Sequence, residues 1–112
     1  MLVTTTIDHT TAVIRPHGEI DAATLPDLDA AARALPTSVT HLVWDLDHAR
    51  FMDVAGLHLL ARQRNACRET GRTLSVIGLA RQPRRLLLLA QHLFPAGRWE
   101  DFLPDGPPEA AA

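Results

Sequence analysis

The positions of apolar residues along the chain predict four β-strands. Residues 3–7 alternate between apolar side chains and threonine, and a second β-rich run follows at 13–17. We expect these runs to pair as a hairpin whose second strand ends soon after Pro16, which has no N–H for a sheet to use. The nearly unbroken apolar run at 41–46 is typical of a strand covered on both faces of a parallel sheet, and a fourth strand is expected at 74–77.

An amphipathic helix is predicted between the hairpin and the third strand. Thr24 and Asp27 have the spacing of a capping box, in which each side chain accepts from the other residue's N–H, and Pro36 ends the helix. Its inner face is formed by apolar residues at helical spacing, which are Leu25, Leu28, Ala32 and Leu35.

A second helix is expected over 54–70. Asp53 is its predicted N-cap, because a carboxylate there accepts from the free N–H groups of the first turn and lies at the positive end of the dipole. Gly71 is the predicted left-handed C-cap. Arg64 falls within the inner stripe, so we expect its guanidinium to reach solvent or to pair. The other residues of this stripe are Leu57, Leu60, Ala61 and Cys67.

A third helix is expected to begin at Pro83. Leu87 and Leu88 are expected outside its core stripe, where they form either a second layer of core or an exposed docking patch. Residues 99–102 are expected to fold back as a short closing element, and 104–112 to be a mobile tail. The predicted core stripe of the third helix consists of Leu86, Leu89, Ala90 and Leu93.

This order of elements predicts an α/β fold. We expect a single domain over residues 1–103 with a small mixed β-sheet of about four strands, built as an N-terminal hairpin followed by βαβαβα, with helices packed on the sheet. A chain of 112 residues, 46% of them apolar, is long enough to bury a core without disulfides.

Composition excludes several classes of function. The eleven cations, all arginine, are interleaved with thirteen acids and leave a net charge of −2, which gives no basic face for nucleic acid. A single cysteine excludes an internal disulfide and a cysteine cluster for zinc. No apolar run approaches the roughly twenty residues of a membrane span, and the start lacks the layout of a signal peptide. We therefore expect a cytoplasmic protein without direct membrane insertion.

Several aspartates follow strand ends that a parallel sheet would bring to one edge, where open α/β sheets bind ligands. Such a cluster could hold a divalent metal or accept a phosphoryl group, but caps and turns account for most aspartates in these positions. His48, Asp53 and His58 are the nearest candidates for zinc, and their spacing matches no compact ligand motif. We therefore expect no metal and no cofactor, with His58 displayed to solvent. The aspartates concerned are Asp21, Asp45, Asp47 and Asp53.

No catalytic site is visible in the sequence. Ser38, Ser75 and Cys67 are the only serine or cysteine nucleophiles, and none lies in a glycine-flanked elbow. The chain also lacks a glycine-rich loop that could cradle phosphates. We expect no enzymatic activity.

Two short motifs resemble those of a known family. Residues 45–57 have the order Asp-Leu, four residues, Phe-Met-Asp, two residues, Gly-Leu, and residues 18–21 read Gly-Glu-Ile-Asp. With element order and spacing in agreement from about Val3 to Phe94, the chain resembles the STAS domains of bacterial anti-sigma factor antagonists.

The resemblance implies a non-enzymatic protein-interaction module whose partner is an anti-sigma factor with an ATP-binding, kinase-like domain. In such antagonists the hydroxyl residue before the glycine is phosphorylated, and here that position is Ala55, which has no oxygen to accept a phosphate. The resemblance therefore implies an antagonist that is not phosphorylated at the usual position and stays competent to bind. The implied partner-binding residues are Asp21, Asp53, Val54, Ala55, Gly56 and His58.

Two alternatives remain open. A STAS module can be a regulatory or scaffold subunit of a lipid-transporting ABC complex or of a stress-signalling assembly, and Ala55 fits such a role because it needs no phosphorylation. A small metal-binding protein or enzyme is the third class, which would require a bound metal or turnover.

Overall fold

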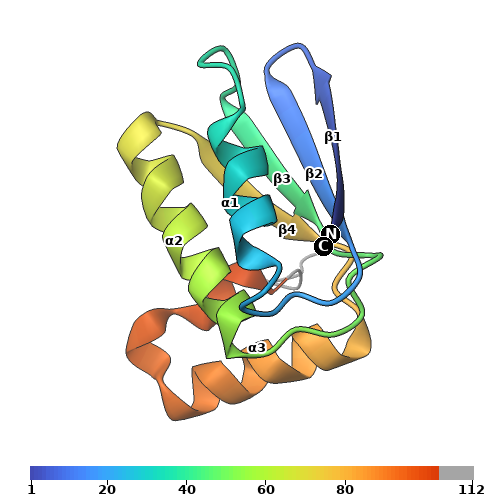
Figure 1. The fold of residues 1–112 in the computed structure, drawn as a ribbon. Coiled ribbons are helices and arrows are strands. Elements are labelled where there is room, and N and C mark those ends of the chain that lie inside the picture. Colours follow the sequence, from blue (N-terminus) through green and yellow to red (C-terminus); the bar gives the residue numbers. More distant parts are fainter. Residues whose placement is uncertain (104–112) are drawn as a thin grey trace.

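A computed structural model describes residues 1–103, so the expected mobile tail, 104–112, lies outside the described residues. Four strands form one sheet in the order β1-β2-β3-β4, in which β1 and β2 are antiparallel and the other neighbours are parallel. This arrangement confirms the predicted α/β fold (Figure 1). The elements are β1 (Leu2–Asp8), β2 (Thr11–His17), α1 (Leu25–Arg33), β3 (His41–Asp45), α2 (Val54–Thr70), β4 (Thr73–Ile77), α3 (Arg81–Leu93), and the 3-10 turns η1 (Pro95–Gly97) and η2 (Trp99–Phe102).

The pairing of neighbouring strands aligns their buried side chains across the sheet. β2 ends at His17, one residue after Pro16, as the missing N–H of proline predicts. Ile14, Trp44 and Val76 face one another across β2, β3 and β4. All three are buried, and they form the middle row of the core between the sheet and the helices.

The sheet is covered by α1 and α2 on one face only (Figure 1). The prediction that β3 is covered on both faces was wrong, since Val43 and Asp45 are only half-buried and Ser75 on the neighbouring strand is exposed. The reason lies in the strand order. From β2 to β4 the sheet grows in one direction, so two right-handed crossovers place both helices on the same side.

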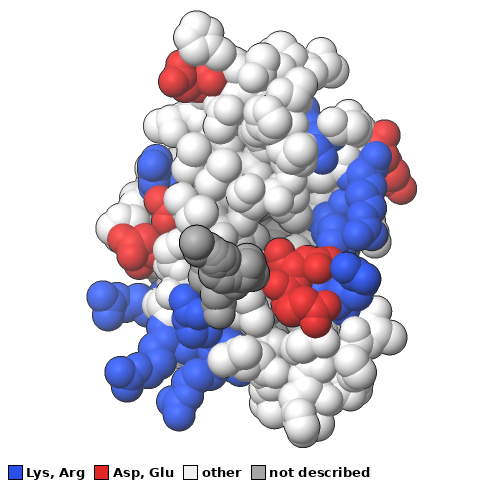
Figure 2. All heavy atoms as spheres, turned by 180° about the vertical axis from the view of Figure 1, so that it is seen from behind, with Lys and Arg blue, Asp and Glu red and all other residues white. Residues whose placement is uncertain are grey.

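The opposite face of the molecule is shown in Figure 2. The centre of its upper part is uncharged, with an acidic group near the top and charged groups along the edges, whereas basic and acidic groups gather over its lower half. Arginine side chains are densest at the lower left corner, the end of the molecule at which α3 begins.

The second helix matches its prediction at both ends. It spans Val54–Thr70, and Gly71 ends it in the left-handed region at φ 72°. Arg64 pairs, as expected: its guanidinium donates to the carbonyl oxygens of Gly97 (2.8 Å) and Arg98 (3.1 Å) and lies 4.8 Å from the ring centroid of Phe102. Residues 99–102 do fold back, and this arginine holds them on α2.

The core stripe predicted for the third helix was correct at Ala90, which is buried, and at Leu86, which packs against the core, but wrong at its other two positions. Leu87 is fully buried, whereas Leu89 and Leu93 are 52% and 55% exposed. The buried stripe is Pro83, Leu87 and Ala90, a spacing as helical as the predicted one. Because leucine occupies four consecutive positions, 86–89, every side of the helix offers an apolar residue and periodicity cannot select the inner one.

The start of this helix was also misplaced. It begins at Arg81, two residues before Pro83. The first N–H groups of a helix have no partner within it, so a proline in the third position costs no hydrogen bond.

Candidate functional site

The site predicted around Asp53 begins where β3 gives way to α2. Asp53 has extended backbone angles, and its Oδ1 accepts from the N–H of Ala55 at 2.8 Å. The predicted N-cap is therefore confirmed. Asp53 and Val54 are exposed and Ala55 is half-buried, so the first turn of α2 presents a mixed polar and apolar surface.

A short parallel bridge joins this turn to the loop after β2. The N–H of Ile20 donates to the carbonyl of Phe51 (3.0 Å), and the N–H of Asp53 donates to the carbonyl of Ile20 (3.2 Å). Ile20 and Met52 are both buried, so the two loops share one small core. The two sequence motifs, far apart along the chain, thus form one surface.

Gln82 at the start of α3 fixes this surface from below. Its side-chain oxygen accepts from the N–H of Met52, and its side-chain nitrogen donates to the carbonyl of Met52, each at 2.9 Å. This clamp was missed by the sequence analysis, because a glutamine in a predicted helix gives no signal of a distant backbone partner. It makes α3 part of the scaffold of the site.

Gly56 lets α2 approach the clamped loop. A Cβ at this position would lie 2.7 Å from the Met52 sulfur and 2.8 Å from the Met52 Cβ. Gly56 is buried, so its contribution is to shape the surface rather than to contact solvent.

Asp21 braces its own loop. The N–H of Asp21 donates to Oγ1 of Thr24 (3.0 Å), and the N–H of Thr24 donates to Oδ1 of Asp21 (3.1 Å). The predicted capping box of Thr24 with Asp27 was wrong: Thr24 makes no side-chain cap, and Asp27 binds the amino group of Met1 at 2.9 Å. The reciprocal pair forms with the residue three positions earlier. The Asp21 carboxylate accepts from the N–H of Thr24, which a capping box would have paired with Asp27.

The remaining candidates for a metal site, Asp45, Asp47 and His48, make contacts within the fold. Asp45 pairs with Arg15 (2.9 Å) and also accepts from the N–H of Asp47 (3.1 Å). His48 stacks on His17, with ring centroids 4.8 Å apart, and does not join Asp53 and His58 in a cluster. Within residues 1–103, no group of three or more histidine, cysteine or acidic side chains is placed to hold a metal ion.

An apolar groove adjoins the first turn of α2. It encloses about 190 Å³ between α2 and α3. Val54, Leu93 and Phe94 are 56%, 55% and 65% exposed along it. The sequence analysis offered an exposed docking patch as one of two explanations for Leu87 and Leu88. Leu87 is buried, and Leu88 is exposed but does not line this groove. The lining residues are Val54, Leu57, Leu86, Leu89, Ala90, Leu93 and Phe94.

Comparison with known proteins identifies the family. The model of the STAS domain matches residues 2–95. The chain belongs to the STAS domain family. No curated protein matches this STAS domain. Among residues 1–103, no helix has both the length and the apolar character that a bilayer crossing demands.

Several solved structures similar to this STAS domain are anti-sigma factor antagonists. The antagonist SpoIIAA in its unphosphorylated form is 18% identical with a TM-score of 0.66, over 88% of this chain and 84% of that one. An antagonist from Mycobacterium paratuberculosis is 29% identical with a TM-score of 0.63, over 84% and 82%. A STAS domain antagonist from Rhodobacter sphaeroides is 20% identical with a TM-score of 0.57, over 68% and 84%.

Proposed function

We propose that this STAS domain is a non-enzymatic interaction module of the anti-sigma factor antagonist type, whose partner is an anti-sigma factor with an ATP-binding, kinase-like domain. The observation that carries the proposal is a continuous exposed apolar surface, which runs from Val54 in the motif to Leu93 and Phe94 on α3. Contiguous exposed apolar surface of this kind marks a protein-interaction site. Membership of the STAS family and the similar antagonist structures support this choice of partner.

The motif residues divide into contacts and supports. Val54 and His58 are exposed on the first turns of α2 and would contact the partner, beside the half-buried methyl group of Ala55. Asp53, as N-cap, and Gly56, through its approach to Met52, hold that turn in place. Asp21 supports the adjoining loop and adds negative charge beside it.

Ala55 determines how such a module would be regulated. A phosphate at this position would carry nearly two negative charges beside Asp53 and Asp21, which adds repulsion and desolvation cost at an interface. Alanine has no hydroxyl to modify, so the protein stays in its binding-competent form. Its activity would then be set by its abundance or by competition among partners.

The positive charge of α3 indicates which kind of partner surface would fit beside it. The first half of the helix carries Arg81, Arg84 and Arg85, and the helix has no acidic residue. A partner that fills the apolar groove would therefore gain from acidic side chains beside its apolar part, on the side facing the start of α3.

The proposal is tested by affinity capture from the native cell lysate, with bound proteins identified by mass spectrometry. Wild type should retain an ATP-binding anti-sigma kinase, and Ala55→Glu should lose it. Glutamate is tolerated in the first turn of a helix, so this variant should fold. Ala30→Glu adds the same charge at an exposed position of α1 and should bind like wild type. Retention of the kinase by Ala55→Glu would refute the proposed interface.

Ala55 also favours a second candidate, a regulatory or scaffold subunit of a transporter or stress-signalling assembly. Such a subunit needs no phosphoacceptor. Recovery of a transporter ATPase or of other STAS proteins, equally with wild type and Ala55→Glu, would support this function instead.

A further inference from the structure

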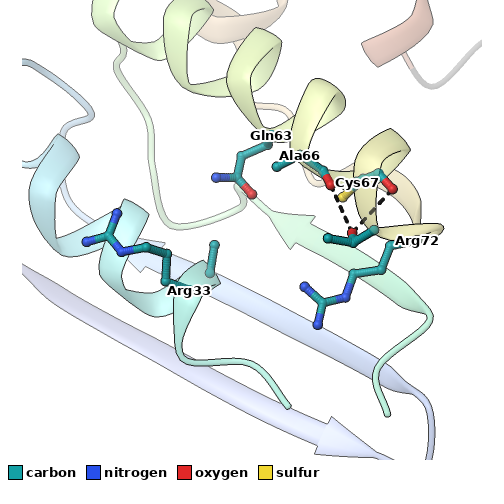
Figure 3. Close-up of a pocket in the computed structure, with 7 residues that line it drawn as sticks. Arg33, Gln63, Ala66, Cys67 and Arg72 are labelled. Atoms are coloured by element: carbon teal, nitrogen blue, oxygen red, sulfur yellow. Dashed lines mark hydrogen bonds between the residues drawn. The ribbon is translucent and has the colours of Figure 1, made fainter. Parts of the chain in front are cut away.

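A cavity of about 250 Å³ opens between α1 and α2, remote from the motif. Ala66 in its wall lies eleven residues after Ala55, which is about 16 Å along the helix. Figure 3 shows its side chains, which come from both helices and from the turn after α2. The residues that carry the argument are Ala32, Arg33, Gln63, Ala66, Cys67 and Arg72.

Gln63 is the central observation. Its side chain is only 7% exposed, and it makes no hydrogen bond with any described residue. Figure 3 shows its amide directed into the space between the helices. Its amide atoms remain accessible from this space while the rest of the residue is buried, so water or a ligand can pair with them there. The amide is placed to bind something that enters the cavity.

The cavity is also positively charged. Among its lining residues, Arg33 and Arg72 are cationic and none is acidic. Arg72 is held in position because its Nε donates to the carbonyl of Val39 and its Nη2 to the carbonyl of Pro36, each at 2.9 Å. Its Nη1 makes no hydrogen bond within the described residues, and Figure 3 shows the guanidinium facing the cavity. A preorganised guanidinium is the usual partner of a carboxylate.

We propose that this cavity binds a small organic carboxylate, held by the Arg72 guanidinium and the Gln63 amide. The apolar part of the ligand would lie against Ala32, Ala66 and Cys67. The volume equals that of about eight water molecules, which suits a compact acid. The site is independent of the proposed protein interface, since the two share no residue.

Benzoate, benzamide and inorganic phosphate distinguish recognition of the ligand's negative charge from recognition of its apolar body. Each is titrated into the ¹⁵N-labelled full chain, and amide shifts are followed by NMR. Benzoate should shift amides around Gln63 and Arg72. Benzamide, with the same body and no charge, and phosphate, with charge and no body, should each bind about tenfold more weakly. Equal binding of benzoate and benzamide, or no shift with benzoate, would overturn the proposal. Equal binding of benzoate and phosphate would also overturn it.

Substitutions of residues in the cavity wall test whether benzoate binds there. Gln63→Leu should keep the fold, because the amide has no partner to lose, and should weaken benzoate about tenfold. Ala66→Leu fills the cavity and should abolish binding, whereas Ala30→Leu, an exposed alanine of α1, should leave it unchanged. Unchanged affinity in both cavity variants would place benzoate elsewhere and refute the site.

Cys67 supplies an independent readout, because it is the chain's only cysteine and lies in the cavity wall. Bound benzoate should slow alkylation of wild type by iodoacetamide and should have no effect on Ala66→Leu. An alkylation rate of wild type that is unaffected by saturating benzoate would contradict the proposed location.

Discussion

Leu87→Ala tests the orientation of α3, on which both the core and the apolar groove depend. The Leu87 side chain is completely buried among the residues that close the lower end of the core. Truncation removes its apolar contacts and leaves a cavity that the clamped helix start, held by Gln82, cannot easily collapse. The expected loss is about 2–5 kcal/mol in the free energy of unfolding.

Leu89→Ala is the matched control. This leucine is 52% exposed along the groove, so the same chemical change should cost less than about 1 kcal/mol. With roughly 4 °C per kcal/mol for a domain of this size, Leu87→Ala should lower the melting temperature by about 8–20 °C and Leu89→Ala by less than about 4 °C.

Urea unfolding followed by circular dichroism provides the free energies, and binding to the captured partner provides the second readout. Leu89→Ala should weaken binding while it preserves stability, and Leu87→Ala should do the reverse at temperatures where it is folded. Equal destabilisation by the two substitutions, or a larger loss for Leu89→Ala, would refute the orientation of α3 described above.

Three further predictions concern α2. Gly56→Ala should cost about 1–3 kcal/mol because its methyl group would overlap Met52, with a reduced urea midpoint as the measurement. Asp53→Ala should cost about 1 kcal/mol through loss of the cap, and Asp53→Asn should restore most of it; equal losses would show that the cap is not the cause. Burial raises the pKa of the Cys67 thiol above its ordinary value of 9.0, with Arg72 acting weakly in the opposite direction. The folded chain therefore holds this proton more tightly than the unfolded chain, so stability should fall as the pH rises above about 9. Cys67→Ala should remove that slope, which is measurable because the chain has no lysine or tyrosine.

The local signals in the sequence predicted local structure well. Asp53 and Gly71 were assigned to the ends of α2 from capping chemistry alone, and both caps have the expected geometry. Hydrogen bonds between residues two to four positions apart depend on little beyond the sequence itself. The pairing of Arg64 was likewise predictable, because a cation within an apolar stripe must find acceptors.

Features that depend on the packing of distant elements could not be predicted in this way. The rotation of α3 is set by how the helix meets the rest of the core, and leucines at 86–89 allowed either face. The bonds from Gln82 to Met52 span thirty positions and have no sequence signature. The unpartnered amide of Gln63 was hidden because glutamine is an ordinary helix residue and gives no sign of burial.

The Gln82 side chain has a consequence for how this architecture can vary. An amide carries the same donor and acceptor as a peptide unit, so Gln82 supplies Met52 with what a neighbouring strand would supply. One side-chain amide thus takes the place of one peptide group of a neighbouring strand, and no further strand is needed. The hairpin of β1 and β2 could be lengthened without disturbing this unit, whereas one residue inserted between β4 and Gln82 would shift the amide out of register. The short segment from Gly78 to Ala80 is therefore less open to insertion than the hairpin, although both are connections between elements.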